Sequence, residues 1–259
     1  MIKKLFITAG IGTLISIVAL CAAAGLAGRE IGTKGWALNL VKDGDHMRIR
    51  KGDASKLPVS ATKTLPWTGG ELLTIDLPVK VEYVQGPENT VTVTGAQSQI
   101  DAVRLEGGKL WMTDTPENQE SINFVIGPDG IDAQSSHDGV SIVVTAPSIN
   151  RFVVLGDGEL AVHNYDQPKL DLELDGDGSF VASGRSEAVK VALSGSGNAD
   201  LGDIHAKTAE VSVSGSGRTT IRASEKASVD ISGSGNVELS AKPAAVVSHI
   251  SGSGSLDQY

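Results

Sequence analysis

Residues 191–201 read VALSGSGNADL, and residues 211–221 and 229–239 repeat this pattern as VSVSGSGRTTI and VDISGSGNVEL. Each copy places a Gly-x-Gly element between two runs of alternating apolar and polar residues. The element occurs six times, at steps of 20, 19, 20, 18 and 19 residues, and its first glycines are Gly156, Gly176, Gly195, Gly215, Gly233 and Gly252. A period this regular indicates a repeat architecture in which each repeat stacks on its neighbours.

Apolar residues keep fixed distances from these turns. Two residues before the first glycine lie Val154, Leu174, Leu193, Val213, Ile231 and Ile250. Four before it lie Phe152, Leu172, Val191, Val211 and Val229, until Ser248 breaks the set; six after it lie Val162, Ala182, Leu201, Ile221 and Leu239. Strands stacked about 4.8 Å apart would join each set into a continuous aliphatic ladder. The sequence therefore predicts an all-β fold, a parallel β-solenoid or β-helix with about 19 residues per rung.

The turns must have the same backbone shape in every rung if the rungs are to stack. Glycine allows a positive φ or a close backbone approach without steric cost. Small polar residues between the glycines, Asp or Ser in every turn, are expected to hydrogen-bond along the stack. The predicted structural turn residues are Gly156, Gly158, Gly176, Gly178, Gly195, Gly197, Gly215, Gly217, Gly233, Gly235, Gly252 and Gly254.

Short β-branched segments separated by Gly, Pro, Asn and Asp begin near Leu72 and are typical of strands. We therefore expect a first β region at 66–146, continuous with a six-turn solenoid at 147–259, after a linker or tether at 29–65. In the linker, Trp36–Val41 is either a short strand or an interfacial segment. Residues 127–139 are polar and are expected to form an exposed loop, with a binding loop as the alternative.

The N-terminus is expected to export the rest of the chain. Lys3 and Lys4 precede an uncharged run from Leu5 to Gly28. About 18 or more such residues can cross a bilayer, whereas the core of a cleaved signal peptide has about 7–15. Residues 1–28 are thus a transmembrane anchor or a signal segment, and their length favours an anchor with its lysines in the cytoplasm. The β domain would then lie in the periplasm or outside a bacterial cell, or be secreted after cleavage.

The composition restricts which side chains can form the core, which partners the chain can bind and whether it can form a disulfide. Apolar residues form 40% of the 259 residues but aromatic residues only 4%, so the core must consist of small aliphatic side chains. The formal charge of −9 argues against a nucleic-acid-binding surface. Cys21 is the only cysteine, so no intrachain disulfide forms. The bulky Leu20 before it is unlike a lipoprotein processing site.

Three stretches carry a family resemblance: the repeated SGSG at 194–197, 214–217, 232–235 and 251–254, VTAPSINRFVVLGDGEL at 144–160, and VKVEYVQGPENTVTVTG at 79–95. Their order and spacing resemble the bacterial head-GIN domain family of autotransporter adhesin-like proteins, over roughly residues 65–259. The first two turns depart from the pattern because they contain Asp in place of Ser. The resemblance implies an exported, mostly membrane-tethered β-solenoid, and it carries no catalytic residues over.

No catalytic residue and no cofactor is expected. The five histidines lack a metal-ligand spacing, and the Gly-Ser-Gly elements lack the following helix and the lysine of a phosphate loop. Asp157, Asp175 and Asp177 could lie on adjacent rungs, where stacked carboxylates would be candidate ligands for Ca²⁺. The alternative is that they are solvated turn residues, because the nonapeptide pattern of Ca²⁺-binding β-rolls is absent.

The sequence thus predicts a non-enzymatic, membrane-anchored domain for binding, adhesion or scaffolding in the cell envelope. The expected partners are the membrane, through residues 5–28, and an envelope polymer or a protein, with no nucleic acid. The alternatives are a sensory or regulatory ectodomain that works through a membrane partner, and a polysaccharide-acting β-helix enzyme. No capping segment follows the last turn, so the coil end near Tyr259 is expected either to be blunted by its short last strand or to self-associate.

Overall fold

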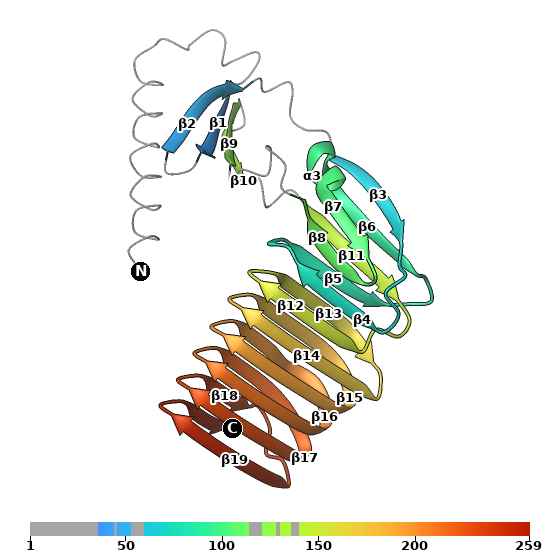
Figure 1. Ribbon diagram of the computed structural model, residues 1–259, viewed down its shortest axis with the longest axis vertical. Helices are drawn as coiled ribbons and strands as arrows, with labels where there is room; N and C mark the ends of the chain where they lie inside the picture. Colours follow the sequence, from blue (N-terminus) through green and yellow to red (C-terminus); the bar gives the residue numbers. More distant parts are fainter. Residues whose placement is uncertain (1–35, 44–45, 53–59, 114–120, 128–129, 136–139) are drawn as a thin grey trace. The chain divides into compact units, whose positions relative to one another are not determined.

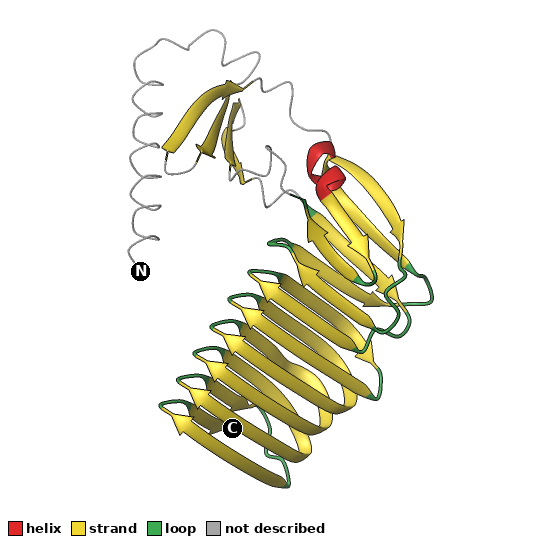
Figure 2. Ribbon diagram, viewed as in Figure 1, coloured by secondary structure: helices red, strands yellow, loops and turns green. Residues whose placement is uncertain are grey.

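The structure, a computed structural model, describes residues 36–43, 46–52, 60–113, 121–127, 130–135 and 140–259. These residues are nearly all in strands, which confirms the all-β prediction (Figure 2). The predicted membrane segment at 5–28 lies outside the described residues and stays a prediction. Within the part of the chain that the structure describes, no helix is long and apolar enough to cross a bilayer.

The chain divides into two compact units, and the smaller one contains a four-stranded antiparallel sheet with the order β10-β9-β1-β2. Its strands are β1 (Trp36–Asp43), β2 (His46–Gly52), β9 (Ser121–Gly127) and β10 (Gly130–Ser135). β1 pairs with β9, with Trp36 opposite Ile126. Strand β1 confirms the short strand that was one alternative for Trp36–Val41, and β2 adds a second strand within the segment 29–65. Part of the expected 127–139 loop is strand β10, which pairs with β9.

The larger unit contains the predicted solenoid (Figure 1). Each rung from Arg151 onward has one strand before its Gly-x-Gly turn and one after it, whereas Leu77-Pro78-Val79 joins the two strands of the first rung. All rungs pair in parallel. The ladder before the turns consists of β4 (Leu72–Asp76), β12 (Arg151–Gly156), β14 (Lys169–Gly176), the second halves of β15 (Ser179–Gly195), β16 (Asn198–Gly215) and β17 (Arg218–Gly233), and β19 (Ala245–Gly252). The ladder after them consists of β5 (Lys80–Gln85), β13 (Glu159–Asp166), the first halves of β15, β16 and β17, then β18 (Asn236–Leu239) and β20 (Ser255–Gln258).

The first rung consists of β4 and β5, which the sequence analysis places in the first β region at 66–146 and not among the repeats. Its strands align with the next rung, so that Phe152 lies opposite Leu73 and Leu160 lies opposite Val81. Strands that come before β4 or between β5 and β12 in the sequence cover the outer edge of the first rung. They are β11 (Ser141–Ala146), β6 (Thr90–Ala96) and β3 (Ser60–Pro66) beside β5, and β8 (Lys109–Met112) and β7 (Val103–Glu106) beside β4, with the short helix α3 (Gln97–Ala102) between β6 and β7. Pairing at this edge removes the unpaired backbone groups that would invite aggregation.

The aliphatic columns point into the coil, and there are more of them than the sequence predicts. The residues four before and six after the first glycine are buried in every rung from 152 to 239. Two further columns are also buried: Leu170, Val189, Ala209 and Ala227 lie six before the next turn, and Leu160, Phe180, Ala199, Thr219 and Val237 lie four after a turn. The residues of these columns differ in size and polarity from rung to rung, which hides their periodicity in the sequence.

Four of the few aromatic side chains pack together where the first rungs meet. The ring of Phe152 lies 5.4 Å from Tyr83, 6.2 Å from Tyr165 and 5.8 Å from Phe180, between centroids. The Tyr83 hydroxyl donates a 2.9 Å hydrogen bond to the carbonyl of Ala146, and burial raises the pKa of Tyr83 to about 12. Both tyrosines thus place a protonated hydroxyl at the edge of an apolar cluster, since burial also raises the pKa of Tyr165, whose hydroxyl donates to the Lys169 carbonyl.

The last rung is the most exposed. β19 pairs with β17, and β20 pairs with β18, and within residues 140–259 no strand pairs with their outer edges. Val247 and Ile250 are 57% and 41% exposed, although residues at the Ile250 position are buried in every earlier rung. Self-association at this end stays a prediction.

One polar side chain interrupts the buried columns. Thr219 lies between Ala199 and Val237 in the stack, is 0% exposed, and its hydroxyl has no hydrogen-bond partner among the described residues. We expect Thr219→Val to raise the free energy of unfolding by about 1 kcal/mol, because it removes an unsatisfied hydroxyl and keeps the shape. Urea unfolding followed by circular dichroism would measure this gain. The neighbouring Thr220→Val, on the outward face, should change little; an unchanged or lower stability of Thr219→Val would contradict the prediction.

Candidate binding groove

A groove of about 710 Å³ crosses the corner of the coil opposite the Gly-x-Gly turns. In each rung, one residue lies six positions after the first glycine of a turn, and another lies six positions before the first glycine of the next turn. These two residues are 8, 7, 8, 6 and 7 positions apart in the successive rungs. The variation in the repeat period therefore falls on this second corner, which is where the groove lies. Its lining comes from five successive corners: Asp166, Gln167, Pro168, Arg185, Ser186, Glu187, His205, Ala206, Lys207, Arg222, Ala223, Ser224, Ala241 and Lys242.

Small residues leave the groove unfilled. Ser186, Ala206 and Ala223 are 6%, 5% and 0% exposed, so each is packed into the corner and has little side chain to project. The Ser186 hydroxyl donates a 3.2 Å bond to the carbonyl of Ala188, and the Ser224 hydroxyl donates one of 3.2 Å to that of Ala206. These bonds tie the serines to the backbone. Larger, charged side chains therefore stand on either side of a shallow polar floor.

Ion pairs occupy the end of the groove that is nearer the first rung. Arg185 donates from Nε and Nη2 to the two carboxylate oxygens of Asp166, at 2.7 and 2.6 Å. This bidentate bond lowers the pKa of Asp166, which therefore stays ionised. Lys207 Nζ lies 2.9 Å from Glu187 Oε1, and this bond raises the pKa of Lys207. The two pairs bridge successive rungs and hold their charged groups in fixed positions.

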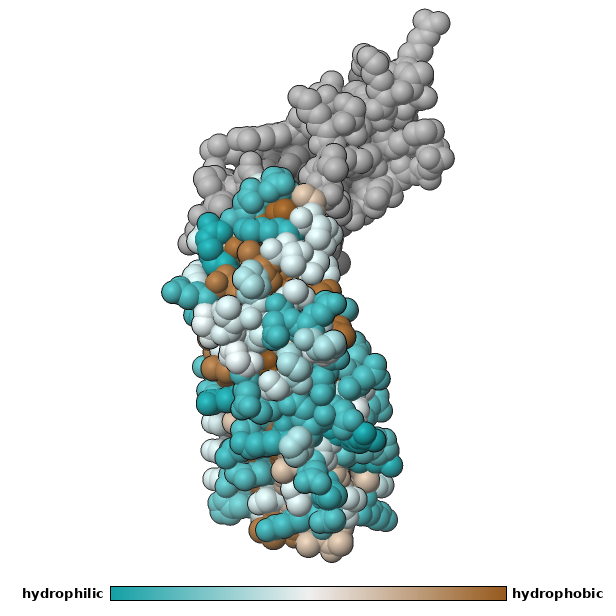
Figure 3. All heavy atoms as spheres, turned by 90° about the vertical axis from the view of Figure 1, so that its right-hand side faces the viewer, coloured by the Kyte–Doolittle hydropathy of each residue, from teal (hydrophilic) through white to brown (hydrophobic). Residues whose placement is uncertain are grey.

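Two basic side chains at the other end have no such partner. Arg222 and Lys242 are exposed, and no ion pair among the described residues includes either of them. Four basic and two acidic side chains line the groove, which gives it a formal charge of +2, whereas the whole chain carries −9. The side of the solenoid that lies at the right in Figure 1 is mainly hydrophilic (Figure 3). The groove is thus a local cationic site on an acidic protein.

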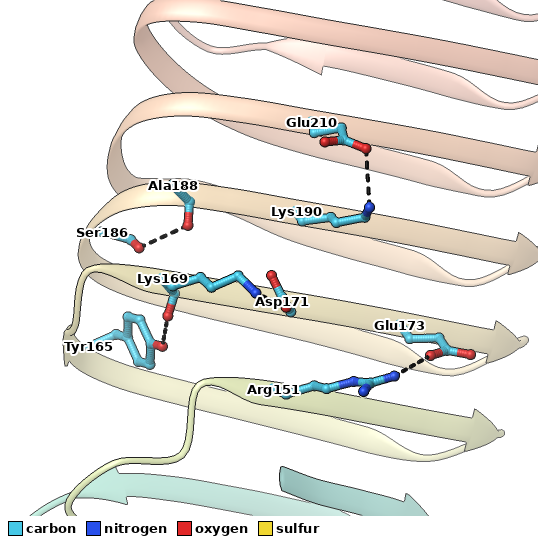
Figure 4. A network of polar contacts seen from close by, with 9 residues as sticks. All are labelled: Arg151, Tyr165, Lys169, Asp171, Glu173, Ser186, Ala188, Lys190 and Glu210. Atoms are coloured by element: carbon cyan, nitrogen blue, oxygen red, sulfur yellow. Dashed lines mark hydrogen bonds and ion pairs between the residues drawn. The ribbon is translucent and has the colours of Figure 1, made fainter. Parts of the chain in front are cut away.

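The outer face of the ladder before the turns carries a different arrangement of charge. Arg151 lies 3.6 Å from Glu173 and Lys190 lies 3.1 Å from Glu210, both across rungs, while Lys169 lies 2.6 Å from Asp171 in the same strand (Figure 4). These three basic and three acidic side chains balance one another, and the exposed Asp175 and Asp230 add negative charge to the same face. Exposed pairs of this kind contribute about 0–1 kcal/mol each to stability. This face is therefore a weaker candidate for binding an anionic ligand than the groove.

The two glycines of each turn are required for different reasons. The first has a positive φ in every turn, from +65° at Gly156 to +126° at Gly252. The second has no room for a side chain, because a Cβ on Gly197 would lie 2.7 Å from the Gly178 carbonyl and would overlap Leu174. Hydrogen bonds between turns run through the backbone, such as Ser216 N to Gly195 O at 2.9 Å. The predicted serine side chains instead line a depression of about 240 Å³ that includes Arg218.

The predicted Ca²⁺ ligands lie apart from the groove. Asp157 and Asp177 are the middle residues of successive turns, Asp175 precedes the second turn, and all three are exposed. Among the described residues, no three His, Cys, Asp or Glu side chains gather in a way that could hold a metal ion. The structure therefore does not bring these three carboxylates together as a site.

Sequence reasoning missed the groove because its residues share no motif. Asp166 and Arg185 are paired in the sheet register, and Arg185 is paired with His205, yet these residues differ in type and in their distance from the turns. His205, one of the five histidines without a metal-ligand spacing, is exposed. One signal in the sequence could have indicated the site. The corner that contains the groove varies in length, whereas the Gly-x-Gly corner does not, and functional residues often lie in the irregular parts of a rigid scaffold.

Comparisons with known proteins agree with the fold. A crystal structure of a "putative adhesin" from Bacteroides fragilis NCTC 9343 is 16% identical, with a TM-score of 0.54, and covers 78% of this chain and 97% of its own. A "putative lipid binding protein" from Parabacteroides distasonis ATCC 8503 is 17% identical, with a TM-score of 0.44, and covers 77% and 96%. No curated protein matches the sequence. Residues 71–243 match the family model described as "Putative auto-transporter adhesin, head GIN domain". Because this match spans more than half of the chain, the protein belongs to the head GIN domain family.

Proposed function

We propose that this protein is a membrane-anchored, extracytoplasmic binding domain that holds an envelope polymer against the side of its solenoid. The observation that carries this proposal is the groove across five stacked corners, with its floor of small residues and its charged walls. Such a groove is long and open, as a site for part of a polymer must be. Parallel rungs fix the backbone positions from which its side chains extend, so binding does not have to order the backbone.

The chemistry of the groove favours binding over catalysis. A glycosidase needs a carboxylic acid whose pKa is raised, so that it can protonate the leaving group, beside a second carboxylate. In the groove, the Arg185 guanidinium lowers the pKa of Asp166 and engages both of its oxygens. Glu187 is bonded to Lys207. Asp166 is therefore ionised and cannot act as a general acid, and both carboxylates are engaged in ion pairs, which supports a non-enzymatic function.

Export and anchoring rest on the sequence. The uncharged run from Leu5 to Gly28 after two lysines fits a retained span. A family described by auto-transporter adhesins is in keeping with a location outside the cytoplasm. An acidic exterior with a cationic groove would repel anionic polymers generally and attract them locally, which favours a defined binding position.

The test is retention on isolated envelope polymer. We expect the full-length chain, purified in a mild detergent, to sediment with insoluble cell-wall material from a bacterium that encodes it, and detergent micelles alone not to do so. Recovery of the chain only with a single stoichiometric membrane protein would instead support the sensory ectodomain. The absence of retention on any envelope fraction would reject polymer binding.

A further inference from the structure

We propose that the groove binds a linear anionic polysaccharide, and that Arg222 and Lys242 contact its carboxylate, sulfate or phosphate groups. This proposal rests on the proposed function and adds the ligand class and the contact residues. It follows from the charge, the shape and the backbone bonding of the second corner.

The charged side chains at one end of the groove form ion pairs, and the basic side chains at the other end form none among the described residues. At the end nearer the first rung, Asp166 and Glu187 already engage Arg185 and Lys207. At the other end, Arg222 and Lys242 are exposed and form no ion pair among the described residues. An anionic group that binds here gains two cationic partners and displaces no carboxylate. Arginine can also bind a carboxylate, sulfate or phosphate in a bidentate manner, which fixes the orientation of the bound group.

The shape of the groove suits an extended chain. Its lining comes from five successive corners, and adjacent rungs lie about 4.8 Å apart, so the groove follows the stack for about 19 Å. Arg222 and Lys242 lie on adjacent rungs, so both can contact one anionic group or two neighbouring groups on one polymer. A compact small molecule would leave most of this length empty.

Backbone bonding at the corner disfavours a peptide ligand. The N–H groups of Glu187 and Ala188 bond to the Pro168 carbonyl at 3.1 and 3.0 Å, and the Ala244 N–H bonds to the Ser224 carbonyl at 3.1 Å. These groups are therefore unavailable to an added strand. A docked helix would need apolar anchor pockets, but only alanine and proline supply apolar lining here. The common modes of peptide recognition, except those based on charge alone, are thus unsuited to this groove.

Neutral sugars and lipid tails fit less well than a charged glycan. The groove has no aromatic ring among its lining residues, so a sugar face has nothing to stack on. It also lacks the deep apolar cavity that an acyl chain would occupy. Hydroxyl groups of a polysaccharide can instead hydrogen-bond to the charged side chains that line the groove, while its anionic groups supply the main attraction.

The experiment measures binding of polygalacturonate oligomers to the full-length chain in mild detergent, by calorimetry at low ionic strength, because salt screens exposed charges. We expect R222Q/K242Q to bind about tenfold more weakly than the wild type. The matched control is R218Q/K80Q, which has the same net charge but changes exposed residues outside the groove, and it should bind as the wild type does. Dextran sulfate should behave like polygalacturonate, and neutral dextran should not bind.

Four results would overturn the proposal, and a fifth would overturn the proposed function on which it rests. Equal weakening in both double variants would show a general charge effect without a site. Binding of neutral dextran as strong as that of polygalacturonate would show that charge is not recognised, and equally strong binding of poly-L-glutamate that was lost in R222Q/K242Q would assign the groove to acidic peptides. If R222Q/K242Q were still retained on cell-wall material, the proposed function would stand and this groove would be the wrong site. If the wild type were not retained, the proposed function itself would fail.

Discussion

Gly195→Ala should lower the free energy of unfolding by about 3–4 kcal/mol, which is a large fraction of the stability of a typical domain. Gly195 has a φ of +111°, which L side chains rarely adopt, and a Cβ there would lie 2.5 Å from the carbonyl oxygen of Gly176 in the preceding rung. That oxygen accepts hydrogen bonds from Ser196 and Gly197 at 3.1 and 3.0 Å. Relief of the overlap would therefore break the backbone bonds that join two rungs.

Gly156→Ala is the matched control for this prediction. Gly156 occupies the same position in the first turn, but its φ is +65° and a Cβ there would meet nothing within 4 Å. Its substitution should cost only the strain of a left-handed backbone, about 1–2 kcal/mol. Urea unfolding would compare the variants, and hydrogen exchange would locate the loss, because repeat proteins can unfold in parts. Equal destabilisation by both substitutions would contradict an essential role for contact between stacked turns.

Phe152→Ala should destabilise the protein by about 3–5 kcal/mol. Phe152 is 0% exposed and lies against the rings of Tyr83, Tyr165 and Phe180. The surrounding strands are joined by parallel backbone ladders, so they can collapse little into the space that the ring leaves. The loss therefore includes both the burial of the ring and the cost of a cavity.

Two control variants distinguish this cavity from a general effect of substitution. Phe152→Leu should cost clearly less than Phe152→Ala, because leucine fills much of the same space. Val181→Ala changes the residue next to Phe180 in β15, at a side chain that is 45% exposed, and it should alter stability by about 0.5 kcal/mol or less. A loss below about 1 kcal/mol for Phe152→Ala would mean that the aromatic cluster is not the packing centre of the first rungs.

The repeating part of the fold can be predicted from the sequence pattern of each rung. The steps between the Gly-x-Gly elements and the columns at Val154 and Val162 predict parallel rungs, and the structure confirms them. The period is local: each rung contains its own turn and its own inward side chains. The columns that contain Ala209 and Thr219 were missed because stacking, not side-chain type, makes those positions buried.

Other parts of the structure depend on partners that are distant in the sequence. β4 and β5 join the coil through β12 and β13, about 80 residues further along the chain, and β1 pairs with β9 over a similar separation. Strand patterns predict that such segments pair but not with which partner, since one alternating segment fits many edges. The boundary expected at residue 146 and the tether expected at 29–65 failed to anticipate these pairings for that reason.

The sequence by itself determined the solenoid, because period, turn glycines and inward columns all repeat within each rung of about 19 residues. Only the tertiary structure decided the groove. Asp166, Arg185, Lys207, Arg222 and Lys242 are spread over 77 positions of the chain and share no spacing, yet stacking brings their corners to one edge. A repeating hydrogen-bond register fixes where each corner lies, and the unequal corner lengths then leave charged side chains around a hollow that no local pattern describes.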